Sequence, residues 1–204
     1  MLCGLALVPD YGARRQIIEF QGRHLDTLEQ PRLGEAVNVP HVTVFQSHFD
    51  PEELTRELLL DVLNAGGVPN KPVSMFTWVF RHPGNWVFAH VECPEWLTSL
   101  HETAVVRLDD YVLHGDIDPG IDLDDHGGWQ AEYYMRYGYR YSWEEFIPHV
   151  TLGKPTSCDT LPDSLDADFK ATLAGEVVQF SHAAFYVAGE AGSFAETICE
   201  VPLL

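Results

Sequence analysis

Polar and apolar residues alternate in two short segments of the chain, at positions 40–44 and 148–152, which have the sequences PHVTV and PHVTL. Side chains two residues apart on a β-strand share a face, so the aliphatic residues of each segment are expected on one face and its histidine and threonine on the other. Each segment is therefore predicted to be a buried strand that presents one imidazole and one hydroxyl to the same side. The four residues concerned are His41, Thr43, His149 and Thr151.

Apolar residues also recur at helical spacing, which predicts helices at about 10–30, 51–66 and 94–114. Asp10 is a suitable N-cap for the first helix, and Asp50, which a proline follows, is typical of the start of the second. Two glycines are expected to end the second helix.

The remaining apolar and β-branched runs predict strands, and a proline–glycine–asparagine turn predicts that two of them form a hairpin. The strands are expected at about 2–8, 36–47, 73–80, 86–92, 147–153, 171–180, 183–188 and 195–201. Residues 154–168 are expected to be a loop. This order of strands and helices predicts an α+β fold of two lobes, each of which contributes one motif strand to a shared cleft; it leaves the direction of strand pairing open.

The repeated pentapeptide is the strongest functional signal in the sequence. A single histidine in a strand is usually structural, whereas two in the same short context favour a shared role. Two His-x-Thr-x motifs, each on a strand, resemble the hallmark of the 2H phosphoesterase superfamily, which includes bacterial 2′,5′-RNA-ligase-like proteins and the cyclic nucleotide phosphodiesterases of plants and fungi. The resemblance implies one bilobal domain over 1–204, in which each lobe is a small sheet with flanking helices and one His-x-Thr strand facing a central cleft.

The chemistry of this family explains why two such motifs are needed. Cleavage of a cyclic phosphodiester requires a base on one side of phosphorus and an acid on the other, and histidine supplies both near neutral pH. His41 and His149 are therefore the expected acid/base pair, with their order left open, and Thr43 and Thr151 are expected to bind the phosphate. No metal or other cofactor is expected, because the two histidines lack a carboxylate or thiolate ligand at motif spacing.

The composition limits the kind of substrate and the compartment. Asp and Glu number 31 against 12 Lys and Arg, which gives a formal net charge of −19. Such a chain repels the backbone of long nucleic acids, so the expected substrate is a small nucleotide or a short oligonucleotide; an acidic coat that only aids solubility is the simpler alternative. No apolar run approaches 18 residues, so no membrane association is expected. The four scattered cysteines are typical of reduced thiols in a cytoplasmic protein.

Residues 115–143 form the least ordinary segment, which we interpret as an insertion between the third helix and the second motif. Its first half is acidic and rich in glycine, and it lacks the glycine and glutamate of a calcium-binding loop. Its second half is aromatic and is a candidate lid that contacts the nucleobase, or else a set of rings that packs the loop onto the lobes. The residues considered for base or lid contacts are Tyr137, Tyr139, Tyr141, Arg136 and Arg140.

The sequence thus favours a metal-independent hydrolase that cleaves a cyclic or 2′,5′-linked phosphodiester of a small nucleotide, in RNA processing or nucleotide turnover. A 2′,5′-ligase acting on RNA ends is an alternative, because ligation reverses the same reaction. A non-catalytic module that binds nucleotides or another protein is a second alternative. The substrate, the 2′ or 3′ product and the oligomeric state are left open.

Overall fold

The computed structural model describes residues 1–204 apart from 30, 83–85, 116–127, 156–159, 190–191 and 204. Its strands are β1 (Leu2–Pro9), β2 (Val42–His48), β3 (Val73–His82), β4 (Trp86–Val91), β5 (His149–Gly153), β6 (Val177–Ala188) and β7 (Phe194–Pro202). Its α-helices are α1 (Tyr11–Arg23), α2 (Arg56–Ala65), α3 (Glu95–Leu108), α4 (Trp129–Tyr137) and α5 (Asp163–Thr172). Short 3₁₀ helices are η1 (Pro51–Glu53), η2 (Asp109–Tyr111) and η4 (Trp143–Glu145).

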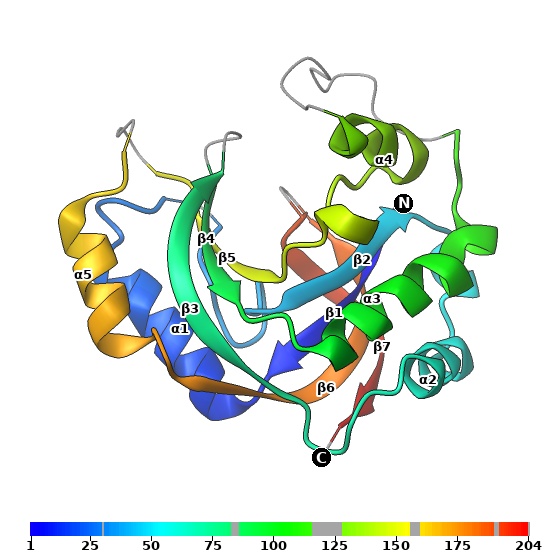
Figure 1. Ribbon diagram of the computed structural model, residues 1–204, viewed down its shortest axis with the longest axis horizontal. Helices are drawn as coiled ribbons and strands as arrows, with labels where there is room; N and C mark the ends of the chain where they lie inside the picture. The colour runs from blue at the N-terminus through cyan, green and yellow to red at the C-terminus, as the bar shows by residue number, and fades with distance from the viewer. Residues whose placement is uncertain (30, 83–85, 116–127, 156–159, 190–191, 204) are drawn as a thin grey trace.

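The strands form one antiparallel sheet in the order β2-β1-β6-β3-β4-β5, with β7 paired to β6 (Figure 1). Strand β6 joins the two halves: residues 177–179 pair with β3, whereas residues 180–187 pair with β1. The two motif strands, β2 and β5, are therefore the two ends of the strand order. The sheet curls so that these ends approach each other, with Cα atoms within 8 Å. The predicted cleft between two motif strands follows directly from this curl.

Two pairs of helices cover the outside of the curled sheet, one pair on each half. Helices α2 and α3 contact each other and pack on β7 and β2, respectively, while α1 and α5 contact each other and pack on β6 and β3. Figure 1 shows the two pairs on opposite sides of the molecule. The predicted α+β fold is confirmed; its strands form one continuous sheet, of which each half has its own pair of helices, rather than two separate small sheets.

Local capping explains where the first helices begin. The Asp10 carboxylate accepts a hydrogen bond of 2.8 Å from the backbone N–H of Ala13, so this predicted cap is confirmed. Asp50 caps only η1, and the hydroxyl of Thr55 caps α2 by accepting from Leu58 N–H at 3.2 Å. The predicted second helix is therefore two elements.

The prediction of a loop over 154–168 is wrong, because helix α5 begins at Asp163. Leu165 and Phe169 lie one turn apart on this helix and are fully buried, and the Phe169 ring packs edge-on to Phe20 of α1 at 5.8 Å. With only these two large apolar residues buried among acidic neighbours, the apolar stripe was too sparse to recognise in the sequence.

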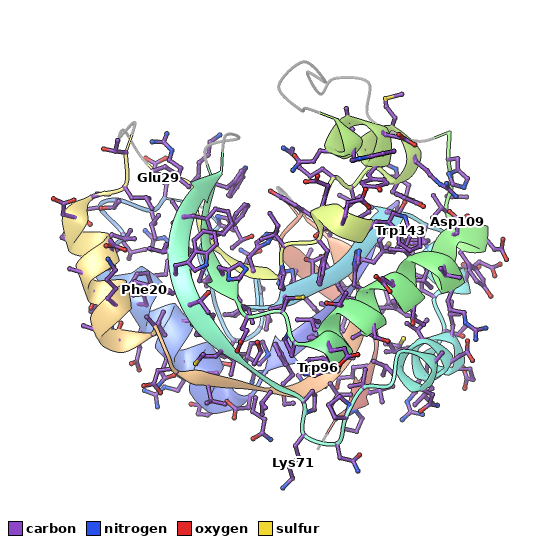
Figure 2. All side chains as sticks on the ribbon, in the orientation of Figure 1. Phe20, Glu29, Lys71, Trp96, Asp109 and Trp143 are labelled. Carbon is purple, nitrogen blue, oxygen red and sulfur yellow. The ribbon has the colours of Figure 1, made fainter. Side chains whose placement is uncertain are left out.

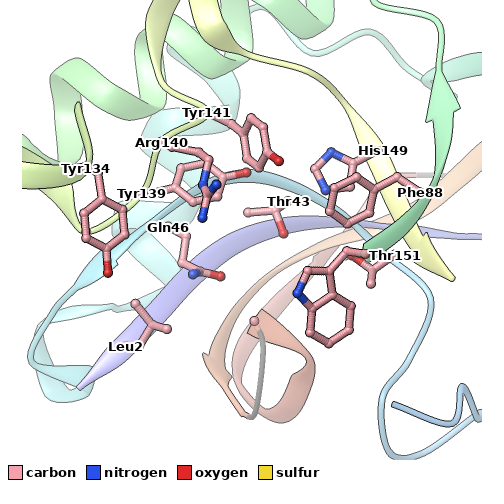
Figure 3. Close-up of a pocket in the computed structure, with 13 residues that line it drawn as sticks. Leu2, Thr43, Gln46, Phe88, Tyr134, Tyr139, Arg140, Tyr141, His149 and Thr151 are labelled. Carbon is pink, nitrogen blue, oxygen red and sulfur yellow. The ribbon is translucent and has the colours of Figure 1, made fainter. Parts of the chain in front are cut away.

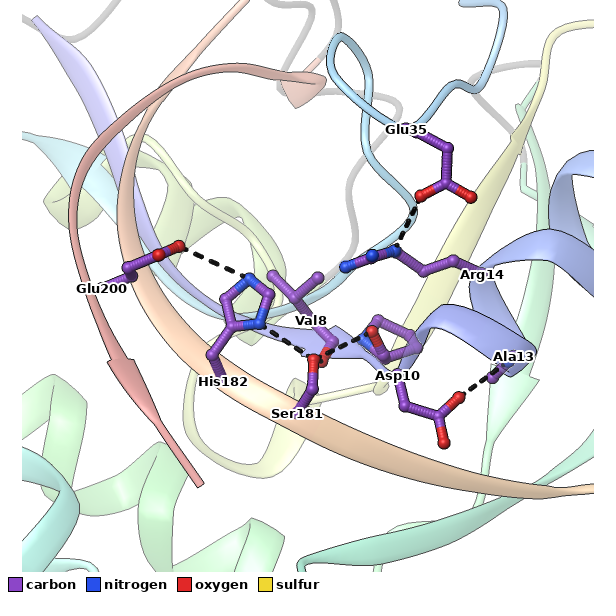
Figure 4. A network of polar contacts seen from close by, with 9 residues as sticks. Val8, Asp10, Ala13, Arg14, Glu35, Ser181, His182 and Glu200 are labelled. Carbon is purple, nitrogen blue, oxygen red and sulfur yellow. Dashed lines mark hydrogen bonds and ion pairs between the residues drawn. The ribbon is translucent and has the colours of Figure 1, made fainter. Parts of the chain in front are cut away.

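The prediction of two strands at 171–180 and 183–188 is also wrong, because residues 177–188 form the single strand β6. The polar residues Ser181 and His182 interrupt the apolar run and imitate a turn. In the structure Ser181 donates its hydroxyl proton toward the carbonyl oxygens of Val8 and Pro9, where the pairing of β1 with β6 shifts register (Figure 4). His182 lies between Ser181 and Glu200 and faces a different cavity from the motifs.

The segment interpreted as an insertion is only partly described. Most of its acidic half, 116–127, lies outside the described residues, whereas its aromatic half forms α4 and η4 rather than one open loop. Helix α4 ends at Gly138, which adopts the left-handed conformation with a φ of 70°. It packs against β2, so this segment contacts the first motif strand. In the part of the chain that the structure describes, no helix has the length and apolar character needed to span a membrane.

Candidate active site

The predicted alternation along both motif strands is present in the structure. Val42, Val44, Val150 and Leu152 are buried in the core, whereas both histidines and both threonines of the motifs are only partly buried. The aliphatic side chains therefore anchor each strand and leave the polar ones on its other face.

Both imidazoles are oriented by the same local contact. The Nδ1 atom of His41 lies 2.8 Å from the carbonyl oxygen of Val39, and Nδ1 of His149 lies 2.6 Å from that of Ile147. A carbonyl oxygen only accepts, so Nδ1 is the protonated nitrogen in each ring. In each neutral imidazole Nε2 is then the basic nitrogen, the one that exchanges a proton with a substrate.

The surroundings of His41 are apolar. Its ring packs edge-on to Tyr186 at 5.0 Å and to Phe194 at 5.5 Å between centroids. Burial lowers the pKa of His41 to about 4, and the hydrogen bond to Val39 opposes this shift only in part. His41 is therefore neutral at pH 7.

His149 instead borders a larger opening. Its ring lies 4.0 Å from that of Phe88, tilted by 37°, and edge-on to Tyr141 at 5.3 Å. It lines a cavity of about 270 Å³ together with threonines from both motifs (Figure 3). The lining residues are Leu2, Thr43, Gln46, Trp86, Phe88, Tyr134, Gly138, Tyr139, Arg140, Tyr141, His149, Thr151 and Gly192.

His41 lines a second, much smaller cavity of about 10 Å³, which shares Thr151 and Gly192 with the larger one. The two cavities adjoin at these shared residues, so the four motif residues lie around neighbouring spaces. A space of this size is close to the minimum that holds a single water molecule.

The candidate lid residues separate into two groups. Tyr139, Arg140 and Tyr141 line the larger cavity, and Figure 3 shows the Arg140 guanidinium projecting toward Thr43 and Gln46. Arg140 is the one lysine or arginine among the lining residues that the structure describes. It places a positive charge in the cavity of an otherwise strongly acidic chain.

The other two candidates do not line this cavity. Tyr137 is buried in the core, where its ring packs edge-on to Phe45 at 5.4 Å. Arg136 is at the surface, where its guanidinium donates to both carboxylate oxygens of Asp109, the shorter bond at 3.0 Å.

A buried hydrogen-bond chain beneath Thr43 escaped the sequence analysis. The Thr43 hydroxyl lies 3.1 Å from the hydroxyl of Tyr186, which donates to Oε1 of Gln46 at 3.0 Å. Tyr186 has one proton and gives it to Gln46, so Thr43 donates to Tyr186. Thr43 and Tyr186 are 143 positions apart, and no local signal connects them.

Two further contributions were missed for different reasons. Trp86 and Phe88 line the cavity from alternate positions of β4, a pattern that only knowledge of the neighbouring strand would have made informative. His101 is fully buried and uses both ring nitrogens: Nδ1 lies 2.7 Å from Val44 O, and Nε2 accepts from Trp143 N–H at 2.8 Å. It connects the first motif strand to the segment that leads into the second.

No three or more His, Cys, Asp or Glu side chains within the described ranges are grouped so that they could hold a metal ion. The charged and polar side chains that line the cavity include Arg140, His149, Gln46, the two threonines and the three tyrosines. These groups can donate hydrogen bonds to an anion and exchange protons with it.

No family model matches the chain, and a search of curated proteins gives no significant match. Solved structures do match. The protein TT0787 of Thermus thermophilus aligns over 100% of this chain and 98% of its own, with a TM-score of 0.60 and 16% identity. Escherichia coli LigT in its apo form aligns over 98% and 96%, with a TM-score of 0.52 and 12% identity. The chain therefore shares its fold with TT0787 and LigT, in agreement with the fold that the resemblance of its two motifs implies.

Proposed function

We propose that this protein is a metal-independent phosphodiesterase that cleaves a cyclic or 2′,5′-linked phosphodiester of a small nucleotide. The main support is the matched pair of imidazoles. His41 and His149 come from opposite ends of the sheet, have the same Nδ1 anchor and line adjoining cavities with Thr43 and Thr151. Two such bases on either side of a phosphate suit an in-line displacement.

His41 is the general base in this proposal. Its lowered pKa keeps it neutral, and the adjoining space of about 10 Å³ suits one water molecule. The Nε2 atom of His41 takes a proton from this water as its oxygen bonds to phosphorus.

His149 is the general acid on the opposite side. As the bond from phosphorus to the leaving oxygen breaks, that oxygen takes the proton from Nε2 of His149. The proton on His41 then returns to solvent, and solvent reprotonates His149, so the cycle balances without a metal ion.

The remaining polar groups of the cavity stabilise the phosphate. Thr151 and the Arg140 guanidinium are positioned to donate to the non-bridging oxygens, whose charge increases in the transition state. The cavity of about 270 Å³ lies just below the usual volume range of small-molecule sites, which favours a nucleotide over a duplex. The net charge of −19 also disfavours long nucleic acids.

The same groups could also join RNA ends, if a ribose hydroxyl replaced water as the nucleophile that attacks a cyclic phosphate and the ring oxygen left with a proton from the acid; the similarity of fold to LigT keeps this ligase activity as a second candidate. Its substrate would be an RNA end, which must approach an acidic surface. The ligase proposal therefore predicts a stronger dependence on salt than the hydrolase proposal.

A substrate screen with a chelator tests the proposal. We expect hydrolysis of at least one 2′,3′-cyclic mononucleotide, ADP-ribose 1″,2″-cyclic phosphate or 2′,5′-linked dinucleotide, at an undiminished rate in EDTA. The variants His41→Ala and His149→Ala should lose this activity, whereas His114→Ala, which changes an exposed histidine outside the cavity, should keep it. Activity that requires a divalent metal, or that survives both motif substitutions, would overturn the proposal.

A further inference from the structure

Aromatic rings form a continuous strip that runs from His149 on β5 across β4 to Trp78 on β3. The centroids of His149 and Phe88 are 4.0 Å apart, those of Phe88 and Phe80 are 5.4 Å apart, and those of Phe80 and Trp78 are 4.7 Å apart. Trp78 also stacks on His90 at 4.7 Å with an interplanar angle of 20°. We call Trp78, Phe80, Phe88 and His90 the aromatic strip; side chains along these strands are drawn in Figure 2.

The strand register explains why these rings share a face with the candidate active site. Strand β4 pairs Phe88 with Thr151 and His90 with His149, and β3 pairs Phe80 with Phe88. Directly paired residues project to the same side of a sheet, so the strip continues the surface that the second motif begins. Trp78 precedes the Val79–Ala89 pair, beside a register shift between Phe76 and Val79, and its ring stacks on His90.

The strip changes from buried to exposed along its length. Phe88 is buried at the cavity wall, whereas Trp78 is 49% exposed and does not line the cavity. Two strand spacings, about 10 Å, separate Trp78 on β3 from the second motif on β5. The strip therefore extends past the space that would hold the reacting phosphodiester.

We infer that Trp78 and Phe80 form a stacking site for a nucleobase at least one nucleotide away from the reacting phosphodiester, so that the substrate is a short single-stranded oligonucleotide. This inference rests on the proposed function and names its substrate class. Aromatic side chains exposed on neighbouring strands of a sheet are a general means of binding successive bases of a single strand. The continuity of the strip with the cavity supports this occupant over an unrelated protein partner.

The charges near the strip agree with a short strand and disagree with a long one. The ammonium group of Lys154 lies 5.9 Å from the ring centroid of Trp86, at the end of β4 that lines the cavity, and Arg140 lines the same cavity. Lys154 can serve a phosphate next to the reacting one, to which the proposed function assigns Arg140. A longer nucleic acid would meet the acidic remainder of the chain.

Two substrates that share the same reacting end test the inference: a 2′,3′-cyclic mononucleotide and a trinucleotide that ends in the same cyclic phosphate. We expect the wild-type protein to favour the trinucleotide in kcat/KM by about tenfold or more, the change expected from one or two stacking contacts. Trp78→Leu and Phe80→Leu should remove most of this preference and leave the mononucleotide rate unchanged. Tyr11→Leu is the matched control, because Tyr11 is an exposed aromatic on α1, outside the strip.

A trinucleotide whose two other bases are replaced by abasic sites adds a second perturbation. The wild-type protein should treat it like the mononucleotide, and Trp78→Leu should cause no further loss, because the stacked base and its platform act together. Equal loss of both substrates in Trp78→Leu, or an unchanged preference in both strip variants, would overturn the inference.

A binding measurement separates failure of this inference from failure of the proposed function. Fluorescence anisotropy with a labelled trinucleotide that lacks the cyclic phosphate should give an affinity that falls about tenfold in Trp78→Leu, whether or not any substrate is hydrolysed. An unchanged affinity would overturn the stacking site while leaving hydrolysis of the mononucleotide intact. A wild-type dimer that Trp78→Leu converts to a monomer would instead assign the strip to contact between two copies of the chain and would overturn the inference.

Discussion

The two His-x-Thr motifs have nearly the same sequence and the same imidazole anchor, but they lie in different surroundings. His41 is enclosed by Tyr186 and Phe194 beside a space for one water molecule, whereas His149 borders the larger cavity beside Phe88. The repeat therefore supplies two equivalent groups, and the tertiary neighbours make them unequal. In the proposed mechanism, this difference assigns the role of base to one imidazole and that of acid to the other.

The two threonines differ in the same way. Thr43 donates to Tyr186, which donates to Gln46. In contrast, no side chain among the described residues hydrogen-bonds to the Thr151 hydroxyl, which faces both cavities. In the proposed mechanism, Thr151 therefore donates to the phosphate directly, whereas Thr43 can do so only when its proton turns away from Tyr186.

The largest expected effect separates the two histidines by role. His41→Ala and His149→Ala should each lower turnover by about 10²–10⁴ on a substrate with a ribose leaving group. With a p-nitrophenyl ester of a nucleotide, whose leaving group needs no proton, His149→Ala should recover most of the activity while His41→Ala should not. Steady-state rates on both substrates measure this, and recovery of His41→Ala instead would reverse the assignment of acid and base.

The second prediction concerns His101, which holds the two motif-bearing segments together. Both of its nitrogens have backbone partners only in the neutral form, and burial lowers its pKa to about 4. The pKa of His101 is lower in the folded protein than its unfolded value of 6.5, so the neutral side chain contributes fully to stability above pH 6.5. That contribution is lost as the pH falls from 6.5 to 4. The difference between these two pKa values corresponds to about 3 kcal/mol in the free energy of unfolding.

Urea unfolding at pH 7 and pH 4 checks this in the wild type and in His101→Gln, whose amide offers a donor and an acceptor but does not titrate. Between pH 7 and pH 4, the free energy of unfolding of the wild type should fall by about 3 kcal/mol more than that of the variant. Equal losses would show that His101 is not the group responsible, since the acid sensitivity of His41 is common to both proteins.

The third prediction compares the threonines. Thr151→Val should lower kcat by about 10- to 100-fold, because it removes a donor that is already directed to the phosphate. Thr43→Val should have a smaller effect, because its proton is engaged with Tyr186 in the unbound protein. The comparison fails if Thr43→Val proves the more damaging substitution while both variants keep the wild-type unfolding temperature.

A feature of the fold or of the candidate site could be predicted from the sequence where residues close by in the chain determine it. The alternation around His41 and His149, the Asp10 cap and the β3–β4 hairpin are set by neighbours in sequence, and all of them are present in the structure. Helix α5 was missed because its burial depends on α1, which lies more than a hundred residues away in the chain. Tyr186 could not be found at all, because its ring on β6 reaches Thr43 of β2 only across Gly4 of β1, the strand that lies between them in the sheet.

The smallest expected effect tests whether Tyr186 acts through Thr43. Tyr186 is fully buried, and a Cβ at Gly4 would lie only 2.7 Å from its ring, so strand β1 fixes its position. Tyr186→Phe should change kcat by less than about tenfold and should add nothing in the Thr43→Val background, because both substitutions break the same hydrogen bond. Tyr137→Phe is the matched control, since it removes a buried hydroxyl that accepts from Trp143 Nε1 at 3.4 Å and has no link to Thr43. Independent, additive losses in the Tyr186→Phe and Thr43→Val cycle would show that the phenol supports the fold alone, and the asymmetry between the two motifs would then reside in the histidines.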